Sequence, residues 1–189
     1  MKKILFFLTA LVLSVVAIVM VKPFIDEYKE KQKYEFNLDT IDGPITLESF
    51  KGKTVAIFFG YTYCPDVCPT ALSMLSDGLK KLTHEELEDF TGIFISVDPS
   101  RDTLKNLKDY AKYFHPNFIG ATSNDENILK VTKNYGTFFQ KEYLKDSKMG
   151  YSVSHTSNIY IFDKQGKLSS KLEHFVMPSD ITKALKKAL

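Results

Sequence analysis

The chain has 189 residues, with 25 Lys and Arg against 23 Asp and Glu, a formal net charge of +2. This length suits one domain with an appended segment. Basic and acidic residues are interspersed and no basic stripe alternates with aromatic residues, so the sequence does not predict a nucleic-acid partner.

The first predicted element is an apolar segment from Ile4 to Val21, interrupted only by Thr9 and Ser14. As a helix it would span about 27 Å, close to the roughly 30 Å hydrocarbon core of a bilayer. It is longer than the usual signal-peptide core of about 7–15 apolar residues, and no A-x-A cleavage site closes it. We therefore predict an uncleaved N-terminal transmembrane helix within residues 1–22. A cleaved signal peptide is the alternative.

The surroundings of this segment favour a bacterial inner membrane, crossed once, with the folded domain facing the periplasm. No Arg- and Ser-rich transit stretch precedes it, which disfavours import into an organelle. Lysines flank both of its ends, so the positive-inside rule is not cleanly satisfied, although large C-terminal domains often translocate regardless of charge. Residues 23–33 are rich in Lys, Glu and Gln and form a predicted tether to a domain over residues 34–189.

Within residues 34–189, strands alternate with helices. Residues 34–38 and 45–47, separated by the turn signal Asp42-Gly43-Pro44, predict a small N-terminal β-hairpin. The later predictions, in chain order, are a buried strand at 54–60, a helix from 71, a capping box from Thr83 to Glu86, a strand at 93–97, a helix through 104–110 capped by Ser100 or Asp102, a helix from 124 or 125 to about 135, a strand at 156–162, a turn at 163–166 into 167–169, and a helix from 179. This order predicts an α/β domain with a mixed central sheet flanked by helices.

The two cysteines stand four residues apart in Cys64-Pro65-Asp66-Val67-Cys68-Pro69, between a predicted strand and a predicted helix. A structural disulfide would close so short a loop that it would stabilise the domain only weakly. A redox pair is a second interpretation, because a helix N-terminus lowers the pKa of a thiol, and Pro69 suits the first helical position. Thioredoxin-type enzymes, however, place two residues between their cysteines, and here there are three. A metal site is the third interpretation, because soft sulfur selects Cu(I).

Four histidines could add an imidazole, which binds copper in either oxidation state. His84 lies in the first turn of a polar helix, His115 precedes a proline, and His174 lies in a polar stretch. His155 lies in a polar loop that leads directly into an apolar strand, and sites assemble at such loops along one edge of an α/β sheet. His155 is therefore the best candidate of the four. A structural zinc site fits less well, because it normally needs four protein ligands.

The segment Phe59 to Pro69 resembles the signature of the Sco/SenC family of copper-binding assembly factors for cytochrome c oxidase. Three further segments match that family in order, namely Ile95–Thr103, Tyr151–Ser157 and Asp163–Gly166. The similarity spans roughly Phe36 to the last helix. A membrane anchor followed by a thioredoxin-like domain is also the arrangement of the family.

The resemblance implies that Cys64, Cys68 and His155 bind one copper ion, as Cu(I) or Cu(II), and that the two cysteines form a redox disulfide. The implied partners are the copper-bearing subunit of cytochrome c oxidase and other copper carriers. The chain would then be a membrane-anchored copper chaperone that assists assembly of the dinuclear copper site. The alternative is a thiol-disulfide oxidoreductase that reduces the cysteines of that site.

One departure from the family is Ser154, where an aspartate is usual. An aspartate there could orient the histidine, so its loss could alter copper affinity or the imidazole tautomer. Asp98, Arg101 and Asp102 match an acidic and arginine-containing loop of the family. A helix cap and a local ion pair explain these three residues as well as a role in the site does.

Overall fold

The computed structural model describes residues 2–145, 147, 149–173 and 176–189, and the chain divides into two units, Met1–Lys33 and Tyr34–Leu189. Helix α1 runs from Lys2 to Tyr34 and contains Pro23, so the predicted tether over residues 23–33 is helical. No helix among the described residues combines the length with the apolar character that a membrane crossing needs. The transmembrane helix therefore stays a prediction.

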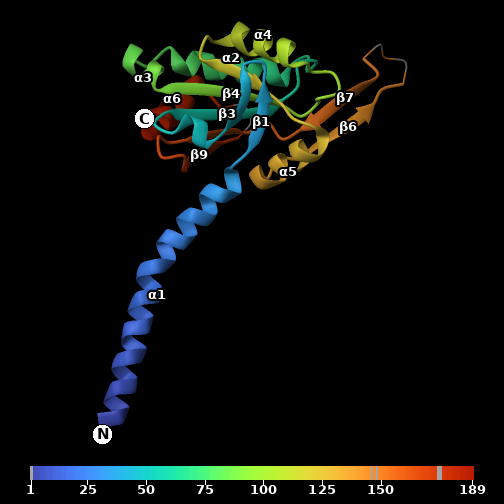
Figure 1. The fold of residues 1–189 in the computed structure, drawn as a ribbon. Coiled ribbons are helices and arrows are strands. Elements are labelled where there is room, and N and C mark those ends of the chain that lie inside the picture. The colour runs from blue at the N-terminus through green and yellow to red at the C-terminus, as the bar shows by residue number, and fades with distance from the viewer. Residues whose placement is uncertain (1, 146, 148, 174–175) are drawn as a thin grey trace. The chain divides into compact units, whose positions relative to one another are not determined.

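The second unit is an α/β domain (Figure 1). Its strands are β1 (Asn37–Thr40), β2 (Gly43–Thr46), β3 (Thr54–Gly60), β4 (Phe90–Ser96), β5 (Phe118–Ala121), β6 (Phe139–Tyr143), β7 (Tyr151–His155), β8 (Ile159–Phe162) and β9 (Leu168–Leu172). Its helices are the 3₁₀ turn η1 (Glu48–Phe50) and α2 (Val67–Leu79), α3 (His84–Glu88), α4 (Leu104–Phe114), α5 (Asp125–Tyr135) and α6 (Pro178–Ala188).

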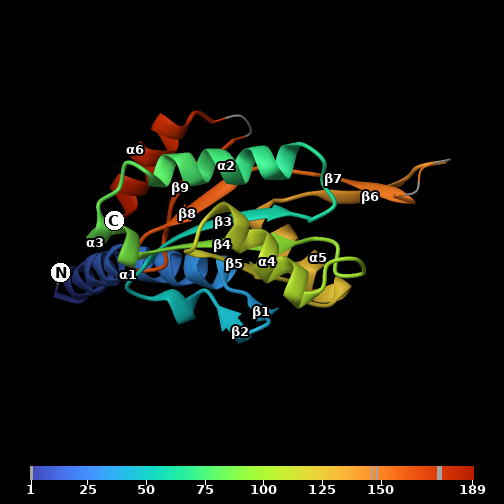
Figure 2. The ribbon, with the colours of Figure 1, turned by 90° about the horizontal axis from the view of Figure 1, so that it is seen from above.

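The central sheet has the strand order β5-β4-β3-β8-β9 (Figure 2). β3 is parallel to β4 and antiparallel to β8, so the sheet is mixed, as the alternation of elements predicts. All seven residues of β3 are buried, which explains why its sequence is a continuous apolar run without polar alternation. Two separate hairpins, β1–β2 and β6–β7, complete the strands.

Helices cover both faces of the sheet, with α2 and α4 on one side and α5 on the other (Figure 1). Successive side chains of β3 point to opposite faces. Phe58 therefore stacks on Phe94, which in turn contacts Tyr110 of α4, whereas Phe59 contacts Tyr135 of α5. The end of β3, from which the cysteine loop emerges, is thus fixed by aromatic packing on both faces.

Several local predictions are confirmed. β3 has the predicted bounds, Thr83 and Glu86 form the predicted capping box, and α5 begins after the N-cap Asn124. The N-terminal hairpin and the turn between β8 and β9 are also present.

Others are wrong in instructive ways. The N-cap of α4 is Thr103, whose side chain accepts a hydrogen bond from the backbone of Asn106, and not Ser100 or Asp102. The strand predicted at 156–162 begins only at Ile159. Tyr151 to His155 form strand β7 and not a loop, because they pair with β6, a strand that the polar sequence of residues 139–143 did not predict.

Candidate metal centre

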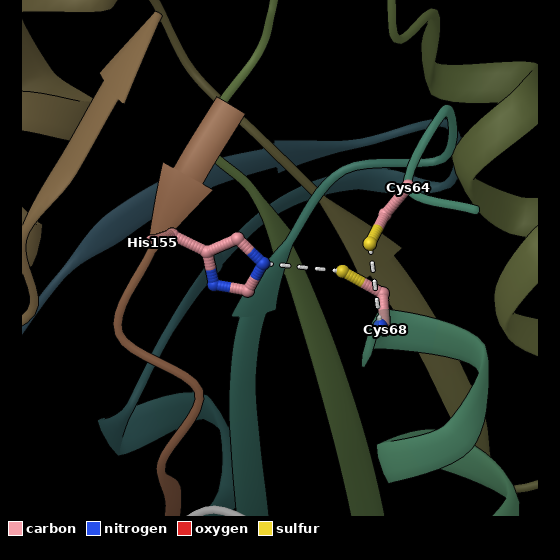
Figure 3. Close-up of side chains that lie close together, drawn as sticks. All are labelled: Cys64, Cys68 and His155. Atoms are coloured by element: carbon pink, nitrogen blue, oxygen red, sulfur yellow. Dashed lines mark hydrogen bonds between the residues drawn. The ribbon is translucent and has the colours of Figure 1, made fainter. Parts of the chain in front are cut away.

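The two cysteines lie where the chain passes from β3 to α2 (Figure 3). α2 begins at Val67, so Cys68 is its second residue and Pro69 its third, and the prediction that Pro69 starts the helix is wrong. The backbone N–H of Cys68 donates a hydrogen bond to Cys64 Sγ at 3.4 Å. Cys68 is buried and Cys64 is half-buried, so a partner can reach Cys64 first.

Gly60, the last residue of β3, makes room for the buried sulfur. A Cβ atom at this position would lie 2.7 Å from Cys68 Sγ and 2.8 Å from the Phe94 ring. Both distances are shorter than ordinary van der Waals contact. The chain therefore needs glycine here so that the Cys68 side chain can pack against the end of β3.

His155 reaches the cysteines through the pairing of β3 with β8. In this antiparallel pair Phe58 is opposite Ile159, so the end of β3 adjoins the start of β8. The residues that follow β3 and those that precede β8 are therefore neighbours in space. His155 Nε2 lies 3.2 Å from Cys68 Sγ, across a sequence separation of 87 residues (Figure 3).

Among the residues that the structure describes, Cys64, Cys68 and His155 form the one group whose Cys, His or carboxylate atoms are spaced to hold a metal ion. The two sulfurs and the ring nitrogen all lie within 4.8 Å of one another. Ligand atoms bound at about 2.0–2.3 Å from one ion are at most about 4.6 Å apart, so the group needs only a small contraction. The structure thus brings the three predicted residues together.

The protonation of the two thiols is unequal. The pKa of Cys64 is lowered to about 3, chiefly because the Cys68 side chain can donate a hydrogen bond to the Cys64 thiolate. The pKa of Cys68 is raised, because this hydrogen bond retains its proton and because burial disfavours its thiolate. At neutral pH the pair holds one thiolate and one thiol.

The tautomer of His155 follows from its second nitrogen. Nδ1 lies 3.1 Å from the carbonyl oxygen of Thr156, which can only accept a hydrogen bond. Nδ1 therefore carries the proton in the neutral ring, and the lone pair of Nε2 faces the sulfurs. This is the arrangement that a metal-binding imidazole needs.

A pocket of about 330 Å³ opens beside this group, lined by Tyr61, Cys64–Val67, Ser152–His155 and Ser157. Ser154 directs its hydroxyl away from the ring, donating a hydrogen bond to Glu142 Oε1 at 2.6 Å. The residue that differs from the family pattern is therefore turned toward the neighbouring strand β6 and not toward the imidazole.

The other histidines lie elsewhere. His84 is exposed on α3, 3.4 Å from Glu88. His115 accepts a hydrogen bond from the backbone of Asn117, and burial lowers its pKa. His174 lies outside the described residues.

Asp102 supports the cysteine segment in a way that its sequence position did not indicate. Its carboxylate accepts hydrogen bonds from Ser96 Oγ at 2.5 Å and from both the backbone N–H and the hydroxyl of Thr62, at 3.1 and 2.5 Å. An acidic residue before a helix is typical of an N-cap. Nothing in the spacing identifies Thr62, forty residues earlier, as its partner.

Fold and geometry define an α/β protein with a Cys-Cys-His group at the end of a central strand, and comparison with known proteins gives its family. The SCO1/SenC family profile matches residues 26–189. An SCO2-like protein of Rickettsia conorii is 36% identical over 155 residues, which cover 80% of this chain and 74% of the relative. The chain belongs to the SCO1/SenC family, and its fold is thioredoxin-like, as the resemblance implies.

Two solved structures bear on the site. Bradyrhizobium japonicum ScoI, whose structure has copper bound, is 37% identical with a TM-score of 0.72, over 82% of this chain and 98% of that one. BsSco is 26% identical with a TM-score of 0.60, over 82% of this chain and 91% of that one. It is described as having a disulfide switch and as a member of the Sco family of cytochrome c oxidase assembly proteins.

Proposed function

We propose that this chain is a copper chaperone that binds one copper ion through Cys64, Cys68 and His155 and assists assembly of the dinuclear copper site of cytochrome c oxidase. The observation that carries the proposal is the meeting of two sulfurs and one imidazole nitrogen within 4.8 Å. Family membership and the copper-bound relative support the choice of metal. The donor set agrees with that choice, because thiolates favour Cu(I) and imidazole suits copper in general.

The protonation of the three proposed ligands determines how copper binding depends on pH. Cys64 offers a thiolate at neutral pH, and Nε2 of His155 lies beside the sulfurs. Cys68 must release its proton when the metal binds, so acid opposes binding. Oxidation of both sulfurs to a disulfide removes two of the three donors, which couples copper release to redox state.

The alternative function is thiol-disulfide exchange with the cysteines of the oxidase, and the low pKa of the half-buried Cys64 supports it. Cys64 Sγ would attack one sulfur of a client disulfide, forming a mixed disulfide and releasing the other client sulfur as a thiolate. Cys68 would then lose its proton and attack Cys64 Sγ, releasing the second client thiolate. The client is reduced by two electrons, and this chain is oxidised to the Cys64–Cys68 disulfide.

One variant separates the two functions. We expect His155→Ala to lose stoichiometric copper, measured by metal analysis and copper(I) titration of residues 34–189 purified under reduction. The same variant should retain most of its disulfide exchange, because no exchange step uses the imidazole. His84→Ala, on an exposed helix, is the matched control. Unchanged copper binding in His155→Ala would refute the ligand assignment.

We also propose that residues 1–22 anchor the chain once in a bacterial inner membrane, with the domain in the periplasm. The apolar run from Ile4 to Val21 supports this. The full chain should stay in the membrane pellet after alkaline carbonate extraction, whereas a chain without residues 1–22 should be released. Protease added to spheroplasts should digest the domain. A carbonate-soluble full chain would overturn the anchor.

A further inference from the structure

An ion pair between the buried carboxylate of Asp98 and the partly buried guanidinium of Arg101 lies between the two segments that carry the three proposed ligands. Asp98 is 0% exposed, and Arg101 Nε donates a hydrogen bond to its Oδ2 at 2.5 Å. Both residues follow β4 and neither belongs to the Cys-Cys-His group. A buried pair of this kind is costly to break, because the remaining charge stays desolvated.

The ion pair holds the first residue of the histidine strand at three points. Arg101 Nη1 donates to the carbonyl oxygen of Tyr151 at 2.8 Å, and the Tyr151 hydroxyl donates to Asp98 Oδ1 at 2.7 Å. The guanidinium carbon also lies 3.6 Å from the centre of the Tyr151 ring. Cation and aromatic face are thus in direct contact.

Fixing Tyr151 fixes His155, because alternate residues of a strand point to the same side. Tyr151, Val153 and His155 share one face of β7, and the backbone N–H of Val153 donates to the Tyr61 hydroxyl at 3.2 Å. A shift of one residue would turn the imidazole away from the sulfurs. Among the described strands β7 pairs with β6 alone, so side-chain contacts link it to the central part of the domain.

The same guanidinium also reaches the cysteine segment. Arg101 Cζ lies 5.0 Å from the centre of the Tyr63 ring and 5.5 Å from that of Tyr61. Tyr63 directly precedes Cys64. Arg101 is therefore packed between the residue before the first cysteine and the first residue of the histidine strand.

We propose that Arg101, held by Asp98, is a positioning residue that sets the distance between His155 and the cysteine sulfurs. It touches no ligand atom and acts through Tyr151 on one side and Tyr63 on the other. Its effect on copper rests on the proposed function, but its effect on the position of the ring does not.

The test is a double-mutant cycle on the full chain in detergent, with copper(I) and a chromogenic copper(I) chelator as competitor. Arg101→Lys keeps the charge but loses the planar fork. We expect it to weaken copper binding about tenfold, the low end for residues that orient metal ligands. In the His155→Ala background the same substitution should change the affinity less than about twofold, because its effect passes through the ring. Equal losses in both backgrounds, or no loss in either, would overturn the proposal.

Two further variants complete the test. Tyr151→Phe removes only the hydroxyl that donates to Asp98, and it should weaken copper binding in the same way as Arg101→Lys but by less. It replaces Arg101→Lys in the test if that variant does not fold. Tyr143→Phe, on the same hairpin and 80% exposed, is the control and should bind copper normally.

A metal-free measurement separates this proposal from the proposed function. His155 packs edge-on against Tyr61, with ring centres 6.1 Å apart. Contacts between these rings in nuclear Overhauser spectra should weaken in Arg101→Lys and persist in Tyr143→Phe. If the parent chain binds no copper but this pattern holds, the proposed function fails and the positioning role stands. If the ring contacts are unchanged in Arg101→Lys, the positioning role fails.

Discussion

The cysteines and the histidine reach the site from regions that are built in different ways. The cysteines follow β3, a strand of the central sheet that is buried at every residue, and Cys68 lies in the first turn of α2. The histidine ends β7, which belongs to a separate two-stranded hairpin held to the domain by side chains. The difference indicates that the sulfurs depend chiefly on packing of the central sheet, whereas the imidazole depends in addition on the contacts that Arg101 and Asp98 make with Tyr151. The following predictions test that division.

The largest effect is expected in the core beneath the cysteine segment. Phe59→Ala removes a fully buried ring between α5 and the sheet, and should lower the free energy of unfolding by about 3–5 kcal/mol. The control is Phe138→Ala, next to the hairpin and 62% exposed, which should change it by less than about 0.5 kcal/mol. Urea denaturation measures both. Similar losses in the two variants would contradict the division.

The second prediction concerns the reactivity of Cys64 with pH. An ordinary thiol, with a pKa near 9.0, loses about a thousandfold of its thiolate between pH 8 and pH 5. Because the pKa of Cys64 is lowered to about 3, its alkylation by iodoacetamide should stay nearly constant over that range. Cys68→Ala removes the side-chain donor that is the chief cause of the shift, and should restore a steep decline. A tenfold fall per pH unit in the parent chain would rule out a stable thiolate.

Gly60→Ala tests how closely the sheet sets the position of Cys68. The added methyl group meets the sulfur and the Phe94 ring, and should cost about 1–3 kcal/mol of stability and weaken copper binding. Gly92→Ala is the control, because its methyl group would clash with Phe118 in the same sheet, away from the site. The two variants should lose similar stability, and only Gly60→Ala should lose affinity. An equal effect on copper would mean that general destabilisation, and not the sulfur position, is responsible.

The smallest effect is expected from Ser154→Asp, which restores the residue usual in the family. The Ser154 side chain points to Glu142 and away from the imidazole, so copper affinity should change by less than about threefold. A carboxylate beside Glu142 should cost a few tenths of a kcal/mol, as like charges do across strands. A change of tenfold or more would show that this side of β7 also acts on the ring.

How much of the site the sequence reveals also differs between the two regions. The continuous apolar run of residues 54–60 predicts β3 correctly, because burial on both faces leaves no other pattern. The cysteines are four residues apart, and their place at the end of this strand follows directly. Strand β7 was missed, although Tyr151 to Ser154 alternate apolar and polar residues, because the segment is short and its pairing with β6 is not visible in the sequence.

The side-chain contacts that connect the two regions could not be predicted from the sequence either. Asp102 precedes a helix and therefore indicates a cap, but it accepts hydrogen bonds from Thr62 instead. The hydrogen bond from Arg101 to Tyr151 spans fifty residues. Local spacing predicts neither contact, because each depends on how β3, β4 and the hairpin come together. The family resemblance supplied His155 as a ligand, whereas spacing alone only ranked it first among four histidines.

The pairing of β8 with β3 determines when, during folding, the three proposed ligands come together. Cys68 and His155 are 87 residues apart, so the three donors do not meet until the last strands have joined the sheet. An unfolded chain keeps its two sulfurs close together in sequence but does not hold His155 beside them. The three-donor site therefore forms only after β7 and β8 have joined the domain. If the chain passes copper on, as we propose, each round of loading and release needs the same folded arrangement of the three donors.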